Sequence, residues 1–198
     1  MFVTFEGLDG SGKTTQVELL RAALEAEGRE VVSTREPGGT EVGEQIRQVV
    51  LHGLPITPWA EAALFAAARA ELVEAVIAPA LERGADVLCD RYIDSSLAYQ
   101  GLAREVGVER VLEMNLQATR GLLPDVTILL MIDPALAEQR HGDAPDRIER
   151  ENADFRARVA QAYRELAELF PRRIATFDGS RLPSELAEEI LGRVRAAA

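Results

Sequence analysis

The stretch GLDGSGKT, residues 7–14, follows a short apolar run and precedes a helical pattern. It fits the spacing G-x-x-x-x-G-K-[ST] of a phosphate-binding loop, whose glycines let backbone N–H groups curl around phosphate oxygens. In such a loop Lys13 reaches the β- and γ-phosphates of a nucleotide, and the hydroxyl group of Thr14 binds Mg²⁺. A flexible turn between a strand and a helix is the alternative interpretation.

Lysine occurs once in the chain: of the 22 basic residues only Lys13 is a lysine, and the others are arginine. This lysine stands inside the phosphate-binding motif, which makes a chance match of the motif less plausible. A signalling GTPase is excluded, because the guanine-reading motif N-K-x-D would need a second lysine.

Short runs rich in Val, Ile, Leu and Phe alternate with longer helical patterns. Strands are expected at residues 2–6, 30–34, 86–90, 126–133 and 173–177. Helices are expected at about residues 13–27, 41–51, 58–83, 95–119, 134–170 with a break, and 183–197. The alternation predicts parallel strands with crossover helices, an α/β layered sheet. Runs such as VLCD and VTILLMID show no period-2 alternation, as expected of strands buried on both faces.

The 198 residues include 33 acidic side chains, and the formal net charge is −11. The length predicts a single domain, residues 1–198. The acidic balance argues against binding to nucleic acid or to an anionic membrane. The single cysteine, Cys89, excludes a disulfide framework. No basic residue precedes Lys13, and the apolar runs at residues 62–68 and 126–132 are too short to span a bilayer, so we expect a cytoplasmic protein.

A phosphate-binding loop needs a carboxylate at the end of a neighbouring strand to orient its metal ion. Two aspartates compete for this role. Asp133 is followed by Pro134, which is typical of a helix N-cap and explains the aspartate structurally. Asp90 has no such cap motif, and the adjacent Arg91 is unusual unless an anion binds there. The sequence favours Asp90, together with Thr14, as the protein ligands of Mg²⁺.

A second anion site is indicated by TREPGGTEVGEQIR, residues 34–47. The segment begins where a strand ends, and this is the edge at which open α/β sheets bind ligands. Arg35, Pro37 and Arg47 lie on this turn and the helix after it, and the planar guanidinium group suits phosphate oxygens. A surface loop in which Arg47 pairs with a neighbour such as Glu44 is the alternative.

Arg69 lies on the apolar stripe of an expected helix and has no acidic residue within one turn on its face. It therefore needs a partner from outside the helix, and Phe65, one turn away, offers a flat surface for stacking a base. An arginine whose stem covers core residues is the alternative. Ser96, Tyr99 and Gln100 share one helix face and could read a base edge, although a solvated face fits the pattern equally well.

The stretch at residues 141–145 interrupts the helical pattern with Gly142 and Pro145. A polar break between two helices predicts a mobile flap at about residues 140–150. Asp143, Pro145 and Asp146 indicate the start of the next helix.

Three arginines, Arg140, Arg147 and Arg150, stand in or beside this flap. Beside a phosphate-transfer site, such an arginine would stabilise charge on the migrating phosphoryl group. The alternative is surface ion pairs at i, i+4 spacing, which would join Arg147 to Glu151 and Arg150 to Asp146 or Asp154.

In this order, the segments resemble the bacterial thymidylate kinases along nearly the whole chain. The matching stretches are FEGLDGSGKTTQ at residues 5–16, TREPGGTEVGEQIR at 34–47, LFAAAR at 64–69, DRYIDSSLAYQG at 90–101 and DRIERE at 146–151. The resemblance implies a P-loop kinase three-layer fold, a five-stranded parallel sheet flanked by helices with a mobile lid. It also implies ATP-dependent phosphorylation of thymidine 5′-monophosphate (dTMP) to the diphosphate (dTDP), with Mg²⁺, usually by a homodimer.

The resemblance implies a role for each matching position. ATP would bind the loop residues Gly7, Asp9, Gly10, Ser11, Gly12, Lys13, Thr14 and Thr15. The monophosphate of dTMP would bind Arg35, Arg47 and Arg91, with Pro37 beside them and Asp9 near the deoxyribose and acceptor phosphate. Phe65 would stack on thymine, Arg69 would bond its O4, Ser96 and Gln100 would contact the base edge, and Tyr99 would crowd the 2′ position.

Members of this family carry a catalytic arginine either in the phosphate-binding loop or in the lid. Gly10 follows Asp9, so the resemblance places this chain in the lid-arginine class. Its lid, RHGDAPDR, is shorter than in many bacterial members and has fewer arginines. Arg147 is therefore the implied catalytic arginine and Arg140 would lie against adenine, with Lys13 and Arg91 completing the catalytic set alongside Asp9.

Two rival functions stay open: a kinase for another nucleoside monophosphate, and a nucleotide-switched binding protein. A switch protein needs no second phosphate pocket, so it would leave Arg35, Arg47, Arg69 and Arg91 unexplained.

Overall fold

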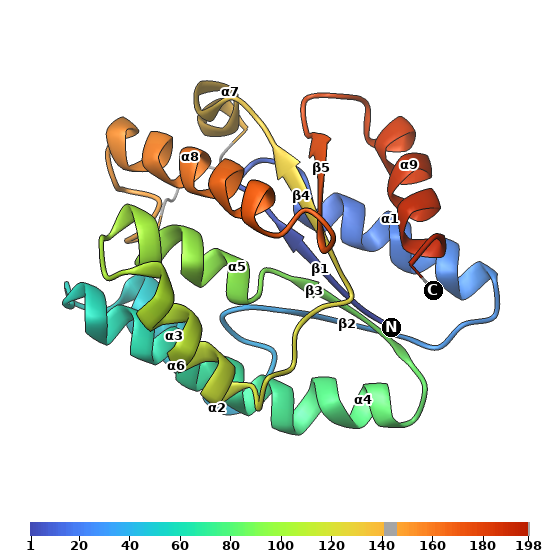
Figure 1. The fold of residues 1–198 in the computed structure, drawn as a ribbon, viewed down its shortest axis with the longest axis horizontal. Coiled ribbons are helices and arrows are strands. Elements are labelled where there is room, and N and C mark those ends of the chain that lie inside the picture. The colour runs from blue at the N-terminus through green and yellow to red at the C-terminus, as the bar shows by residue number, and fades with distance from the viewer. Residues whose placement is uncertain (141–145, 198) are drawn as a thin grey trace.

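The computed structural model describes residues 1–140 and 146–197. Its centre is a five-stranded parallel sheet in the order β2-β3-β1-β4-β5 (Figure 1). The strands are β1 (Phe2–Glu6), β2 (Val31–Arg35), β3 (Asp86–Asp90), β4 (Val126–Met131) and β5 (Ile174–Asp178). The predicted α/β fold is confirmed, and each strand end lies within two residues of its predicted position.

Helices cover both faces of the sheet (Figure 1). On one face, α1 (Lys13–Ala26) and α9 (Pro183–Arg195) pack against Val3 and Phe5 of β1. Phe2 of the same strand packs in the core of the opposite face. Burial on both faces therefore explains the missing alternation. The other α-helices are α2 (Glu41–Arg47), α3 (Pro58–Leu72), α4 (Ala78–Glu82), α5 (Ile93–Ser96), α6 (Val108–Ala118), α7 (Pro134–Gln139) and α8 (Ala153–Leu169).

The helix predicted at residues 58–83 is observed as one continuous rod. A π-helical turn, Val73–Ile77, joins α3 to α4 without a break in helical backbone angles. Pro79 has no backbone N–H to donate, and a wider turn accommodates the missing hydrogen bond. A second π-helical turn, Gln48–His52, extends α2 to one residue past the predicted end.

Two of the predicted helix boundaries are wrong. The helix expected at residues 95–119 is divided: a π-helical segment (Leu97–Ala103) follows α5, and α6 begins only after Gly107, whose φ is 103°. The helix expected to start near Asp146 begins at Ala153, where Asn152 caps it by accepting from the N–H of Phe155 at 2.8 Å. Asp146 instead accepts from backbone N–H groups of a short turn, which competes with helix formation.

The flap predicted at about residues 140–150 extends over residues 141–145, which lie outside the described residues, as do the expected helix-start residues Asp143 and Pro145. Asp133 caps α7 by accepting from the N–H of Ala135 at 2.8 Å, as predicted. No helix in the described part of the chain is long and apolar enough to cross a membrane.

All strands run parallel, so their carboxyl ends meet at one edge of the sheet. Strand order reverses beside β1, which lies between β3 and β4. Ligands of open α/β sheets bind at such a reversal point. The loop from β1 to α1, which is the phosphate-binding motif, lies there beside the ends of β2 and β3.

Candidate active site

The motif at residues 7–14 folds as a tight loop that ends at the N-terminus of α1. Gly7 has φ 134°, and a Cβ atom there would lie 2.3 Å from the carbonyl oxygen of Leu130, so only glycine fits. The backbone N–H groups at the start of α1 and the helix dipole favour an anion at this position.

Lys13 is the charged centre of the loop. Its side chain is 6% exposed, and its ammonium group donates to the carbonyl oxygens of Gly7 (3.2 Å) and Leu8 (2.9 Å). Burial lowers the pKa of Lys13, and the charge of Arg91 lowers it further, while Asp9 opposes the shift. The lysine is therefore held inside the loop by groups that a nucleotide phosphate can replace.

A cavity of about 540 Å³ opens over this loop. Its walls combine the loop, the ends of β2 and β3, the end of α7 and the segment before α9. The lining residues are Asp9, Gly10, Ser11, Gly12, Lys13, Thr14, Thr15, Gln16, Arg35, Glu36, Arg47, Asp90, Arg91, Arg140, Gly179, Arg181, Pro183 and Leu186.

Thr14 and Asp90 meet in this cavity, although they are 76 positions apart in the sequence. The Thr14 hydroxyl group donates to Oδ2 of Asp90 at 2.8 Å. Asp133, the rival aspartate, is an exposed helix cap. The predicted pair of metal-binding oxygens is therefore brought together, whereas Asp133 has a structural explanation.

A second cavity, of about 100 Å³, adjoins the first. Four residues line both: Asp9, Glu36, Arg47 and Arg91. The remaining walls of the second cavity come from the turn after β2, the π-helical turn after α2, α3, the helical segment after β3 and the turn at residues 146–149. They are Pro37, Leu51, Phe65, Ser95, Ser96, Tyr99, Gln100, Asp146, Ile148 and Glu149. Every predicted base- or sugar-binding residue except Arg69 lines this cavity.

Arg91 lies between the two cavities. Its φ is 71°, an uncommon backbone conformation for a side chain of this size. The guanidinium group pairs with Asp9 and donates to the hydroxyl groups of Ser95 (3.0 Å) and Tyr163 (3.3 Å). It also lies 5.4 Å from the centre of the Tyr99 ring. A strained backbone and a guanidinium group held in one orientation by its neighbours are typical of a binding site.

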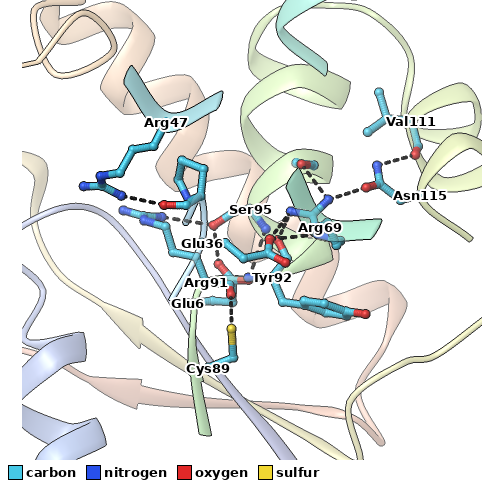
Figure 2. A network of polar contacts seen from close by, with 12 residues as sticks. Glu6, Glu36, Arg47, Arg69, Cys89, Arg91, Tyr92, Ser95, Val111 and Asn115 are labelled. Atoms are coloured by element: carbon cyan, nitrogen blue, oxygen red, sulfur yellow. Dashed lines mark hydrogen bonds and ion pairs between the residues drawn. The ribbon is translucent and has the colours of Figure 1, made fainter. Parts of the chain in front are cut away.

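Arg69 has the external partner that the sequence demanded, and this partner is Glu36. The arginine side chain is 1% exposed and the glutamate 3%, which excludes a side chain that reaches out to solvent. Arg69 donates Nε and Nη2 to Glu36, and its other N–H groups to Ser96, Asn115 and the carbonyl oxygen of Tyr92 (Figure 2). All five donors are thus engaged within the protein.

The arginines of the second predicted segment lie at the edge of the first cavity. Arg35 is 57% exposed and pairs with Glu44 at 2.9 Å, so the predicted alternative partner of Arg47 belongs to Arg35 instead. Arg47 donates to the carbonyl oxygen of Pro37 at 2.9 Å. Figure 2 shows the Arg47 side chain on the same side of the network as Arg91.

Two of the three lid arginines, Arg140 and Arg147, separate in space. Arg140 lines the first cavity and donates to the carbonyl oxygen of Gly179 at 2.9 Å. Arg147 donates to the carbonyl oxygen of Val50 (2.9 Å) and pairs with the buried Glu61 (2.6 Å). It does not line the first cavity.

Glu61 of α3 joins segments that are far apart in the sequence. Besides Arg147, it accepts from Gln100 (2.9 Å) and Arg104 (3.0 Å). Arg104 also pairs with Glu151 while Arg147 pairs with Glu61, so the alternative of a surface pair between Arg147 and Glu151 is not observed. Three donors balance the negative charge of the buried Glu61 carboxylate, whereas an exposed i, i+4 pair would supply a single donor.

Sequence reasoning missed the carboxylates Glu6, Glu36 and Glu61 and the cavity residues Gly179, Arg181 and Pro183. A signal existed for each glutamate. Glu6 is a charged residue at the end of a buried strand, Glu61 interrupts an apolar helix, and the need of Arg69 for a partner pointed to an acid elsewhere. Sequence gave no signal for Gly179, Arg181 and Pro183, because only tertiary packing brings the segment after β5 to the phosphate-binding loop.

A family model for thymidylate kinase matches residues 5–190. A thymidylate kinase of Bifidobacterium longum (strain DJO10A) is 54% identical over 185 residues, 91% of this chain and 90% of the relative. One of Clavibacter michiganensis is 52% identical over 200 residues, 99% and 95% of the two chains. The crystal structure of a thymidylate kinase from Ehrlichia chaffeensis superposes with a TM-score of 0.80 at 30% identity and covers 98% of both chains. The chain belongs to the thymidylate kinase family.

Proposed function

We propose that the two adjoining cavities are the donor and acceptor sites for the reaction of the family. Membership makes the chain a phosphotransferase that converts dTMP to dTDP with ATP as co-substrate. Both cavities share a wall of Asp9, Glu36, Arg47 and Arg91, and the two arginines in this wall are the observation that carries the assignment of the site. A phosphate bound at that wall faces the ATP loop on one side and the aromatic pocket on the other.

Three arginines, Arg35, Arg47 and Arg91, are proposed to hold the acceptor phosphate. Its attacking oxygen is largely ionised at neutral pH, so the protein needs no general base. Phosphoryl transfer passes through a loose transition state, and catalysis then depends on positioning and on stabilisation of charge. Lys13 supplies ammonium donors to the transferred group, and Asp9 fixes Arg91 through their ion pair.

Thr14 and Asp90 are proposed to hold Mg²⁺. Their oxygens, 2.8 Å apart, are hard donors of the kind that Mg²⁺ prefers, and this ion usually completes its shell with water and substrate phosphates. No cluster of three or more metal-binding side chains occurs within residues 1–140 and 146–197, which fits a site formed jointly with a nucleotide. When bound, the ion neutralises charge on the β- and γ-phosphates.

The second cavity is proposed to hold the thymine and deoxyribose. Phe65 would stack on the ring, Tyr99 would exclude a 2′-hydroxyl group, and Ser96 and Gln100 would face the base edge. A direct bond from Arg69 to O4 would require the arginine to give up one of the five hydrogen bonds that it now donates to four acceptor atoms. Ser96 lines the cavity and accepts from Arg69, so it links the arginine to the base.

Arg140 and Arg147 are the candidates for the arginine that stabilises the transferred phosphoryl group. Arg140 already lines the ATP-side cavity. For Arg147 to act, it would have to break its ion pair with Glu61 and bind the transferred phosphoryl group instead.

We also propose that the protein is a single domain over residues 1–198, that it is cytoplasmic, and that it forms a homodimer. Support for the dimer comes from Val42, Val49 and Trp59, large apolar side chains on α2, the π-helical turn after it and α3, each about half exposed. Size-exclusion chromatography with light scattering tests the dimer.

A coupled assay with ATP and a panel of monophosphates tests the assigned site. We expect kcat/KM to be highest for dTMP and lower for deoxyuridine monophosphate, since one methyl group separates substrates by only about 10–200-fold. Uridine monophosphate should be poorer still because of Tyr99. Faster turnover of an adenosine or cytidine monophosphate than of dTMP would overturn the pocket assignment.

A further inference from the structure

Glu6 is a buried carboxylate for which the proposed reaction has no direct use. It is the last residue of β1, directly before the phosphate-binding loop, and its exposure is 0%. Its Oε1 accepts from the backbone N–H groups of Tyr92 (2.8 Å) and Ser95 (3.2 Å). Its Oε2 accepts from the hydroxyl groups of Ser95 (2.6 Å) and Tyr163 (2.9 Å).

The same two hydroxyl groups also contact Arg91. Its Nη1 lies 3.0 Å from the Ser95 hydroxyl oxygen and 3.3 Å from that of Tyr163. Figure 2 shows Glu6, Ser95 and Arg91 in one chain of contacts. Glu6 is therefore one hydroxyl group away from the guanidinium group that is proposed to hold the acceptor phosphate.

The order of protons in this network follows from elementary chemistry. A hydroxyl group has one proton to donate, and guanidinium groups only donate. When the hydroxyl groups of Ser95 and Tyr163 donate hydrogen bonds to the Glu6 carboxylate, the lone pairs of both oxygens face Arg91 and accept from it. Without that carboxylate, either hydroxyl group can turn its proton toward the guanidinium group, which removes an acceptor from a buried charge.

We propose that Glu6 is a positioning residue that aims Arg91 at the acceptor phosphate through the hydroxyl groups of Ser95 and Tyr163. The inference rests on the proposed role of Arg91. Arg91 needs such support, because its backbone is strained at φ 71° and Asp9 alone would hold only its other nitrogen. Glu6 is fixed in turn by β1, and thus couples the rigid sheet to the acceptor site.

The electrostatics of Glu6 agree with this role. Burial, followed by the negative charge of Asp94, raises its pKa to about 7, whereas Arg91 opposes the shift. The other ionisable groups whose charges interact with Glu6 are Lys13, Arg69, Cys89, Tyr99, Tyr163 and Arg173. Protonation of Glu6 would remove an acceptor from the two hydroxyl groups, so acceptor-side binding should weaken as the pH falls through this value.

Steady-state kinetics of Glu6→Gln test the proposal. We expect KM for dTMP to rise about tenfold, the value of one hydrogen bond to a charged group, while KM for ATP changes less than twofold. The ratio of wild-type to variant kcat/KM for dTMP should increase from pH 6 to pH 8, because only the wild type titrates at position 6. This ratio cancels the ionisation of dTMP itself.

Matched variants separate positioning from a general structural effect. Ser95→Ala and Tyr163→Phe each remove one hydroxyl acceptor and should raise KM for dTMP less than Glu6→Gln does. Glu30→Gln removes an exposed glutamate that pairs with Arg83, and should change neither KM. If Glu6→Gln does not fold, the double variant Ser95→Ala/Tyr163→Phe tests the same link with Glu6 in place.

Two outcomes would overturn the proposal: a folded Glu6→Gln enzyme with an unchanged KM for dTMP, or one in which both KM values rise equally. Arg91→Ala separates this failure from failure of the proposed function. If Arg91→Ala raises KM for dTMP while Glu6→Gln does not, only the positioning role is lost. If Arg91→Ala also leaves KM for dTMP unchanged, the assignment of Arg91 to the acceptor phosphate fails.

Discussion

At the scale of single residues, Lys13 shows how the fold buries a charge for use by a ligand. Its neighbours in the loop are carbonyl oxygens and Asp9, so its removal takes away charge without opening the core. We expect Lys13→Ala to remain folded and to lose turnover by on the order of 10³ or more, since preorganised charge lowers the barrier. Arg21→Ala, on the exposed side of α1, should keep full turnover. Near wild-type turnover of Lys13→Ala would disprove the loop assignment.

The contact between Thr14 and Asp90 makes a second prediction at this scale. Asp90→Asn and Thr14→Ala should each raise the Mg²⁺ concentration for half-maximal activity on the order of tenfold, because each weakens one of two protein ligands. Thr14→Ser keeps the hydroxyl group and should behave as wild type. Asp133→Asn is the matched control, because asparagine also caps a helix. If Asp133→Asn raises the Mg²⁺ concentration for half-maximal activity and Asp90→Asn does not, Asp133 rather than Asp90 is the metal ligand.

At the scale of elements, Arg69 and Glu36 join α3 to the turn after β2 inside the core. Loss of one member of a buried pair leaves an uncompensated charge, so Arg69→Ala should lower the free energy of unfolding by about 3–5 kcal/mol. Burial raises the pKa of Glu36, although Arg69 opposes the shift. The loss should therefore be larger at pH 8 than at pH 5, because a larger share of the Glu36 carboxyl group is ionised at the higher pH.

Urea unfolding of Arg69→Ala and of the double variant Arg69→Met/Glu36→Gln checks this prediction. The double variant removes both charges and should recover most of the stability. An Arg69→Ala protein whose destabilisation does not depend on pH would show that lost packing, rather than the unpaired carboxylate, is responsible.

At the same scale, the two possible roles of Arg147, in the turn after residue 145, can be separated by experiment. If Arg147 acts on the transferred group, Arg147→Ala should lower kcat far more than it raises either KM, because the contact forms only in the transition state. If the ion pair with Glu61 is its main function, the variant should lose thermal stability and keep kcat. Arg140→Ala, measured in parallel, shows which arginine carries catalysis.

At the scale of the whole molecule, the buried Glu6 predicts how stability changes with pH. Its pKa is about 7 in the folded protein against 4.5 ordinarily, so the folded state holds the proton more tightly than the unfolded state does. This contribution is fully present below pH 4.5 and is lost as the pH rises through about 7.

Relative to Glu6→Gln, which has no titrating group at position 6, the wild type should therefore lose unfolding free energy between pH 5 and pH 8. Urea unfolding of both proteins at these two pH values measures the difference, and shared titrations cancel. A difference that stays constant with pH would mean that Glu6 remains charged throughout. A carboxylate that lowers stability at working pH is a common feature of functional positions.

Local sequence patterns were sufficient to predict the sheet and the nucleotide-binding loop. Strands buried on both faces require continuous apolar runs, and helices between them require long periodic patterns, so both are readable locally. The loop at residues 7–14 is readable because its glycines and Lys13 stand at fixed spacing within one turn. The choice of Asp90 over Asp133 also followed from local signals, because a helix cap is formed by neighbouring residues.

The contacts between side chains far apart in the sequence could be identified only in the folded protein. The sequence demanded an outside partner for Arg69 but could not name Glu36, which lies 33 positions away. It offered only a local partner, Glu151, as the alternative for Arg147, whereas packing brings Glu61 to this arginine across 86 positions. It passed over Glu6, whose role depends on Tyr163, 157 positions away. Hydrogen bonds within a helix or turn are written into nearby residues, but the partners of buried charges are set by how the elements pack together, and local sequence carries no record of that geometry.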